Sequence, residues 1–154
     1  MSEFDYNPED MEMVMQLVEQ YEQSVKAERV PFFDQEDYER IIEYYEESGR
    51  FENALEVAEQ ALSQYPYSAI LLLKKAQVMF EMKQIDTALE LLDKAAIFDN
   101  SEVGIYLLRA EIYTFQSRYK EAIDLLESLL ETAEADDLPD VYLQLCDVYE
   151  DWEK

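Results

Sequence analysis

The feature that most constrains the fold is a set of residue columns that recur every 34 positions. Ala54, Ala88 and Ala122 are separated by this step. Three further columns keep the same register: Tyr38, Leu72 and Tyr106; Tyr45, Met79 and Tyr113; Phe51, Ile85 and Tyr119. A fixed step of roughly 20–50 residues is typical of repeat architectures, in which each unit buries its apolar face only by stacking on its neighbours.

The step and the columns resemble the tetratricopeptide repeat, a helix–turn–helix unit with the motif Trp-x-x-Leu-Gly-x-x-Tyr, then Ala-x-x-x-Phe, then Pro. The matching residues of the first unit are Tyr38, Ile41, Ile42, Tyr45, Ala54, Ala58 and Pro66. Those of the second are Leu72, Lys75, Ala76, Met79, Ala88 and Leu92, and those of the third are Tyr106, Arg109, Ala110, Tyr113, Ala122 and Leu126. Two positions depart from the motif, because Asn100 replaces the terminal Pro and Ile42 replaces the small Gly. The resemblance implies an all-α fold, an α-solenoid in which antiparallel helix pairs form a right-handed superhelix.

The repeat step predicts how the chain is divided. We expect an N-terminal capping helix and linker over 1–34, three repeats over 35–68, 69–102 and 103–136, and the first helix of a fourth repeat over 137–154. In that last segment Tyr142, Leu145, Cys146 and Tyr149 reproduce the first-helix pattern. The chain stops where a partner helix would begin, which favours a truncated repeat protein. The alternative is a solvating cap, which terminal repeats often need.

Local signals predict helices near 8–28, 35–48, 52–65, 69–82, 86–98, 102–115, 119–134 and 139–153. Helix starts are indicated by Asn7 before Pro8, and by capping residues at Asp34, Ser68, Ser101 and Asp137. Gly49 stands where a left-handed residue would end a helix.

The first predicted helix does not match the repeat motif. It carries apolar residues at helical spacing: Met11, Val14, Met15, Leu17, Val18, Tyr21 and Val25. This pattern favours a cap packed on the first repeat, and a self-association helix with a Met-rich face is the alternative.

The charge balance limits the class of partner. The chain has 37 acidic and 12 basic residues, a net charge of −25. Such a field repels phosphate backbones and anionic membrane surfaces, so we expect no nucleic-acid or membrane partner. A basic protein or peptide would be attracted, although acidity also serves solubility alone. The segment Met1–Asp10 lacks the features of a secretory signal and the apolar runs are short, so a cytoplasmic protein is expected.

The residues that most enzymes and metal sites require are scarce. There is no histidine, and the two glycines cannot form a phosphate-binding loop. Cys146 is the only cysteine and aligns with Ala76 and Ala110, so we interpret it as a small buried residue rather than a nucleophile. The sequence therefore predicts no enzyme, no cofactor and no metal.

The resemblance also implies where a partner would bind, because peptide ligands of this class commonly lie along the concave face lined by the first helix of each repeat. In the first two repeats the residues placed on that face are Glu36, Glu39, Glu43 and Glu46, then Ile70, Leu73, Gln77 and Phe80. In the last two they are Gly104, Leu107, Glu111, Thr114 and Phe115, then Asp140, Leu143, Asp147 and Glu150. An apolar centre between acidic ends favours a basic or basic–apolar segment of a partner protein.

One subclass of the family clamps the C-terminal carboxylate of heat-shock chaperones with Lys, Asn and Arg. Glu39 and Glu43 occupy the positions where that clamp opens, so their charge argues against such a ligand here. Two alternatives stay open for the function: a self-associating structural unit, joined through the N-terminal helix or the open C-terminal repeat, and a regulatory region of a larger protein. A further alternative for the apolar centre is that additional repeats cover it.

Overall fold

In the computed structural model, which describes residues 7–154, the chain forms eight α-helices and no strand. They are α1 (Pro8–Lys26), α2 (Gln35–Glu47), α3 (Phe51–Gln64), α4 (Ala69–Glu81), α5 (Ile85–Phe98), α6 (Val103–Phe115), α7 (Tyr119–Thr132) and α8 (Leu138–Trp152). Each end lies within about two residues of its predicted place. Residues 1–6, which open both the predicted unit 1–34 and the segment Met1–Asp10, lie outside the described residues.

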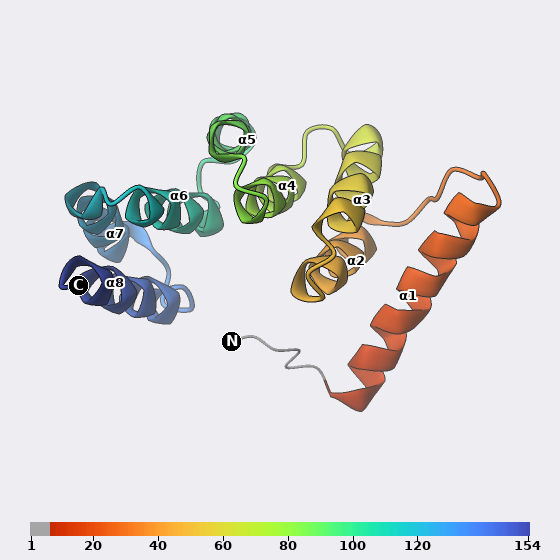
Figure 1. Cartoon of the computed structure of the whole chain (residues 1–154), viewed down its shortest axis with the longest axis horizontal. Helices are drawn as coiled ribbons and strands as arrows, with labels where there is room; N and C mark the ends of the chain where they lie inside the picture. The colour runs from red at the N-terminus through yellow and green to blue at the C-terminus, as the bar shows by residue number, and fades with distance from the viewer. Residues whose placement is uncertain (1–6) are drawn as a thin grey trace.

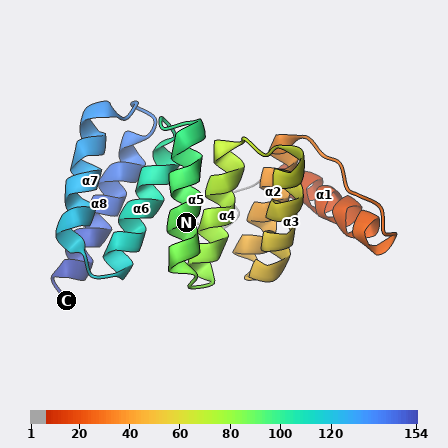
Figure 2. The same ribbon diagram turned by 90° about the horizontal axis from the view of Figure 1, so that it is seen from above.

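The helices stack in chain order as antiparallel pairs: α2 with α3, α4 with α5, and α6 with α7. Helix α1 packs on α2 at one end, and α8 packs on α7 and α6 at the other. Figure 1 shows that the stack curves into an arch, with α2, α4, α6 and α8 along its inner side and α3, α5 and α7 outside. Figure 2 shows the same helices side by side from above. The predicted all-α solenoid is confirmed.

Small residues set the distance between paired helices. Ala54, Ala88 and Ala122 are all fully buried, each in the outer helix of its pair. Because alanine ends at Cβ, the facing helix approaches closely and large side chains fill the space on either side. The buried residues form three clusters along the arch, and the half-buried Leu62, Ile70 and Tyr106 each pack against two of them. Each pair therefore depends on the next for shielding from water.

Side-chain caps explain several helix starts. The amide oxygen of Asn7 accepts a hydrogen bond from the Asp10 N–H at 2.8 Å. A carboxylate oxygen of Asp34 accepts one from the Asp37 N–H at 3.0 Å. The Ser68 hydroxyl accepts from Leu71 N–H at 3.2 Å. These caps satisfy backbone donors that a helix start leaves unpaired.

The prediction that Ser101 caps a helix is wrong. The capping residue of α6 is Glu102, whose carboxylate accepts from Gly104 N–H at 3.3 Å. The Ser101 hydroxyl instead donates to the Asp99 carboxylate at 2.6 Å, within the loop that precedes α6. Asp137 precedes α8 as predicted but its side chain makes no capping hydrogen bond.

Helix α1 covers the first pair with Val14, Val18 and Tyr21, which are buried against α2. The linker that follows is fixed by side chains of that pair. The Tyr38 hydroxyl and the Gln64 amide both donate to the Pro31 carbonyl, at 3.1 and 2.6 Å.

The prediction that Cys146 is buried is wrong, because its side chain is exposed. Its equivalents Ala76 and Ala110 lie under α5 and α7, the second helices of their pairs. Within residues 7–154, α8 packs only on α6 and α7, so no helix covers the side of α8 that carries Cys146.

Candidate partner-binding surface

A pocket of about 640 Å³ lies on the inner side of the arch between α6 and α8. The predicted concave-face residues that line it are Phe80, Leu107, Glu111, Thr114, Phe115, Asp140, Leu143, Asp147 and Glu150. The pocket therefore gathers predicted residues from three successive inner helices, α4, α6 and α8.

Three lining residues were missed by the sequence reasoning: Gln144, Val148 and Asp151. They form a second helical stripe on α8, one position beyond Leu143, Asp147 and Glu150. The Gln144 amide donates to the Leu107 carbonyl of α6 at 2.7 Å, which holds this stripe against the neighbouring helix. A wider stripe of inward-facing positions would have found them.

Exposed apolar side chains lie in the pocket. Leu143 and Phe115 are 64% and 53% exposed, whereas Phe80 is 7% exposed and forms part of the core. The rings of Phe80 and Phe115 pack edge to face, with their centroids 5.7 Å apart. Leu143 and Phe115 can therefore give up contact with water when an apolar side chain enters.

The aromatic pair already faces a cation. The Lys83 ammonium lies 4.9 Å from the centroid of Phe115 and 5.8 Å from that of Phe80. Rings in this position attract positive charge through their electron-rich faces.

The pocket is lined by five carboxylates and by no basic side chain: Glu111, Asp140, Asp147, Glu150 and Asp151. Asp151 is paired with Lys154 at 3.6 Å. Burial raises the pKa of Glu111 above its ordinary value, and the charges of Glu81 and Asp147 raise it further. A positively charged group would relieve this repulsion, so the pocket is suited to a cation.

The other predicted residues lie outside this pocket. Leu73 is 3% exposed and packs against Gly104, where a Cβ atom would lie 2.6 Å from Leu73 Cδ2. Ile70 and Gln77 are half-buried on α4. The missing side chain at Gly104 thus lets Leu73 fill the space between α4 and α6 rather than line a groove.

The negative charge of the predicted acidic residues on α2 is partly neutralised. Glu43 is bound to Lys74 of α4, and Glu39 accepts from the Gln35 amide at 3.3 Å, whereas Glu36 is exposed. Glu46 is half-buried behind them.

Glu46 has the most strongly shifted carboxyl group of this end. Burial raises its pKa to about 7, Lys74 opposes that rise, and Glu81, Glu43 and Glu47 add to it. Part of the predicted charge on this side is therefore lost near neutral pH.

The part of the chain that the structure describes contains no group of three or more His, Cys, Asp or Glu side chains arranged to hold a metal ion. No helix in that part is long and apolar enough to cross a membrane.

Residues 47–129 match the model of the family described as anaphase-promoting complex, cyclosome, subunit 3. The chain belongs to this family of tetratricopeptide-repeat proteins. The match begins at the last residue of α2 and ends within α7, so it covers α3 to α6 and most of α7. No curated protein matches the chain in sequence.

Solved structures share the fold of this tetratricopeptide-repeat chain. The TPR2B domain of yeast Sti1, in a complex with pHsp70, has a TM-score of 0.63 and 15% identity, covering 75% of this chain and 95% of that one. The repeats of a kinesin light chain from Podospora anserina have a TM-score of 0.63 and 18% identity, covering 92% and 80%. The second TPR domain of human RPAP3, in complex with an HSP70 peptide, has a TM-score of 0.56 and 18% identity, covering 73% and 92%.

Proposed function

We propose that this tetratricopeptide-repeat chain is a non-catalytic protein-interaction module that binds a basic–apolar segment of a partner protein on its concave face. The observation that carries the proposal is the pocket between α6 and α8, whose lining has five carboxylates beside apolar side chains and no basic side chain, with Lys83 adjacent over the ring of Phe115. Two chains of the same fold, from Sti1 and RPAP3, were solved with Hsp70 or an HSP70 peptide, which supports a peptide ligand in general.

The pocket favours a ligand with two features. Leu143 and Phe115 offer apolar contact area to an aliphatic or aromatic side chain. Glu111, whose pKa is raised by burial, and the exposed Asp147 beside it offer negative charge to a cation, and an ion pair is stronger where water is partly excluded. An arginine meets both needs, because its stem packs on apolar groups while its guanidinium binds carboxylates.

The same charges argue against an acidic ligand. The HSP70 peptide bound to the RPAP3 domain has the sequence SGPTIEEVD, which contains three acidic residues. Such a peptide would meet the pocket carboxylates, and on α2 it would meet Glu39 and Glu43. We therefore propose that this chain differs from those two domains in ligand class.

A fluorescence-anisotropy titration tests the proposal with three peptides of equal length that are basic–apolar, acidic–apolar and uncharged–apolar. The basic peptide is expected to bind tightest in low salt and to lose affinity as salt rises, because screening weakens charge pairing. Equal affinity for the acidic and basic peptides, or no effect of salt, would remove the electrostatic part of the proposal.

Matched variants locate the site. Glu111→Gln combined with Asp147→Asn is expected to weaken the basic peptide about three- to tenfold. Leu143→Ala is expected to weaken every apolar peptide regardless of charge. The control is Glu127→Gln combined with Glu131→Gln on the exposed surface of α7, which removes the same two charges without touching the pocket. A control that weakens binding as much as the pocket variants would place the ligand elsewhere.

Self-association is a second candidate function, favoured by α1. Met13 and Met15 are 40% and 44% exposed on that helix, beside the apolar stripe that packs on α2. Sedimentation velocity across protein concentrations would detect it. We also propose that the chain has no enzymatic activity, because it lacks histidine, and no nucleic-acid or membrane partner, because its net charge is −25. A cytoplasmic location is part of the same proposal.

A further inference from the structure

The Lys83 side chain lies against two aromatic residues that line the pocket. Lys83 belongs to the turn between α4 and α5, and its ammonium is closer to the ring of Phe115 (4.9 Å) than to that of Phe80 (5.8 Å). Phe115 is the last residue of α6, so the contact joins one helix pair to the next. A cation of the chain itself therefore rests on an aromatic surface that the proposed ligand would use.

This contact is confined to one junction of the arch and is not part of the repeat pattern. At the 34-residue step, none of the equivalent positions holds a lysine or a phenylalanine: Gly49 and Ser117 for Lys83, Glu46 and Thr114 for Phe80, and Glu47 and Glu81 for Phe115. The helix pairs stack in the same order whether or not these three side chains are present. Packing of the repeats therefore does not require the contact, and it occurs where the pocket is.

The backbone of Lys83 is fixed, whereas the end of its side chain is held only by the two rings. The Lys83 N–H donates to the Phe80 carbonyl at 2.9 Å, and the Gln84 N–H donates to the Met79 carbonyl at 2.8 Å. These bonds set the direction in which the side chain leaves the turn. Within residues 7–154 the ammonium makes no ion pair and no hydrogen bond. Because lysine has a long, flexible stem, the ammonium can leave the rings without any change in the turn.

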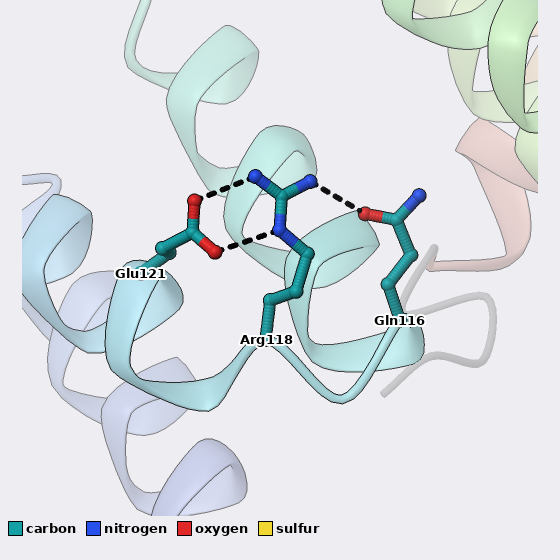
Figure 3. A network of polar contacts seen from close by, with 3 residues as sticks. All are labelled: Gln116, Arg118 and Glu121. Carbon is teal, nitrogen blue, oxygen red and sulfur yellow. Dashed lines mark hydrogen bonds and ion pairs between the residues drawn. The ribbon is translucent and has the colours of Figure 1, made fainter.

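The cation in the following turn is held in a different way, as Figure 3 shows. The Arg118 guanidinium donates to both carboxylate oxygens of Glu121, at 2.7 and 2.5 Å, and to the Gln116 amide oxygen at 3.1 Å. It also lies 4.4 Å from the ring centroid of Tyr113. Displacement of Arg118 would break these hydrogen bonds, whereas displacement of Lys83 gives up only its contact with the rings. Lys83 is therefore the cation that an incoming group can replace.

We propose that Lys83 is an intramolecular competitor, which occupies the aromatic surface of the pocket until an arginine of the ligand displaces it. The inference rests on the proposed function, because it concerns the binding of a basic–apolar segment at the same pocket. Glu111 and Phe115 lie one turn apart on α6, so one arginine reaches the carboxylate and the ring together. Its planar guanidinium binds carboxylates and stacks on aromatic faces, which the Lys83 ammonium does less well. Lys83 therefore lowers the affinity of the pocket for its ligand.

Substitutions of Lys83 test the competition by fluorescence anisotropy with a basic–apolar peptide that carries one arginine. Lys83→Gln is expected to raise the affinity about two- to fivefold, because the arginine no longer displaces a resident cation. Lys83→Arg is expected to lower the affinity at least about twofold, since arginine holds the rings more strongly than lysine does. The control Lys94→Gln removes the same charge from an exposed position on the outer helix α5. An equal gain from the control, or no loss from Lys83→Arg, would mean that only the charge of Lys83 matters and would overturn the proposal.

Nuclear magnetic resonance of the lysines reports directly where the Lys83 ammonium lies. Reductive methylation with isotope-labelled formaldehyde adds methyl groups to each lysine and keeps its charge. The Lys83 methyl signal is expected to be shifted upfield by the ring currents of Phe80 and Phe115, and its loss in Lys83→Gln identifies it. Saturation with the peptide is expected to move this signal to the position of the exposed Lys94. A Lys83 signal that is not shifted in the unbound chain, or that stays shifted at saturation, would overturn the competition.

Failure of the pocket itself gives a different result. If the peptide binds and is weakened by Glu111→Gln combined with Asp147→Asn while the Lys83 signal does not move, the proposed function stands and only the competition is wrong. If the peptide does not bind, or is not weakened by this pair of substitutions, the proposed function is wrong and the role of Lys83 is wrong with it.

Discussion

Two carboxyl groups on the inner side of the arch, Glu46 and Glu111, have pKa values that the fold raises. Burial raises the pKa of Glu46 to about 7 and also raises that of Glu111. Their neighbours are largely other acids, with Lys74 the nearby cation that opposes the effect at Glu46. Because their pKa values are raised, ionisation of either group lowers the free energy of unfolding. The charge of Glu111 faces the proposed ligand.

Replacement of Glu46 should reveal its contribution to stability. Between its ordinary pKa of 4.5 and about 7, the folded chain holds a proton at Glu46 that the unfolded chain has released. The free energy of unfolding therefore falls as pH rises through this interval and is regained below it. We expect Glu46→Gln to stabilise the fold at pH 8 and to have little effect at pH 4.

Urea denaturation at several pH values measures this effect. The control is Glu127→Gln alone, which removes the same charge from an exposed position. An equal gain in both variants would mean that the effect is general repulsion among acids rather than burial of Glu46.

At the scale of the element, the turn within each helix pair has the same left-handed backbone conformation, although its residue differs from pair to pair. Gly49, Lys83 and Ser117 are 34 residues apart, and all three are left-handed, with φ of 76°, 64° and 62°. Only the first is a glycine, the residue that adopts this conformation without strain. The same turn is therefore formed at some energetic cost in the second and third pairs.

Substitutions at these turns should shift stability in opposite directions. Gly49→Ala is expected to lower the free energy of unfolding by about 1 kcal/mol through backbone strain alone, because an added Cβ atom meets nothing within 4 Å. Ser117→Gly is expected to raise it by up to about 1 kcal/mol. Chemical denaturation measures both, and destabilisation by Ser117→Gly would contradict the account.

At the scale of the whole molecule, the net charge of −25 means that most acidic side chains have no basic side chain to balance them. Few basic side chains are available to pair with the acids, and several of the ion pairs are exposed and hence weak: Arg118 with Glu121, Lys120 with Asp124, and Lys154 with Asp151. Repulsion among the remaining acids opposes compaction and is relieved by counterions.

Added salt should therefore act in opposite ways on folding and on binding. Moderate sodium chloride is expected to raise the thermal unfolding midpoint by a few degrees, since about 1 kcal/mol corresponds to roughly 2–4 °C for a chain of this size. The same salt is expected to weaken a basic peptide at the pocket. Differential scanning calorimetry without ligand and anisotropy with ligand measure the two slopes, and slopes of the same sign would contradict the electrostatic account.

The sequence by itself determined the helices, their pairing order and the solenoid. These follow from columns such as Ala54, Ala88 and Ala122, because a small residue at a fixed step sets helix spacing wherever it recurs. It also placed much of the pocket, since residues such as Leu107 and Leu143 lie on predictable faces of their helices.

Only the tertiary structure decided which of those residues meet. Leu73 is buried because Gly104, on the next inner helix, has no side chain there, and Glu43 is neutralised by Lys74 from a neighbouring helix. Cys146 is exposed because burial depends on which helix packs against a position, whereas a repeat column records only its place on its own helix.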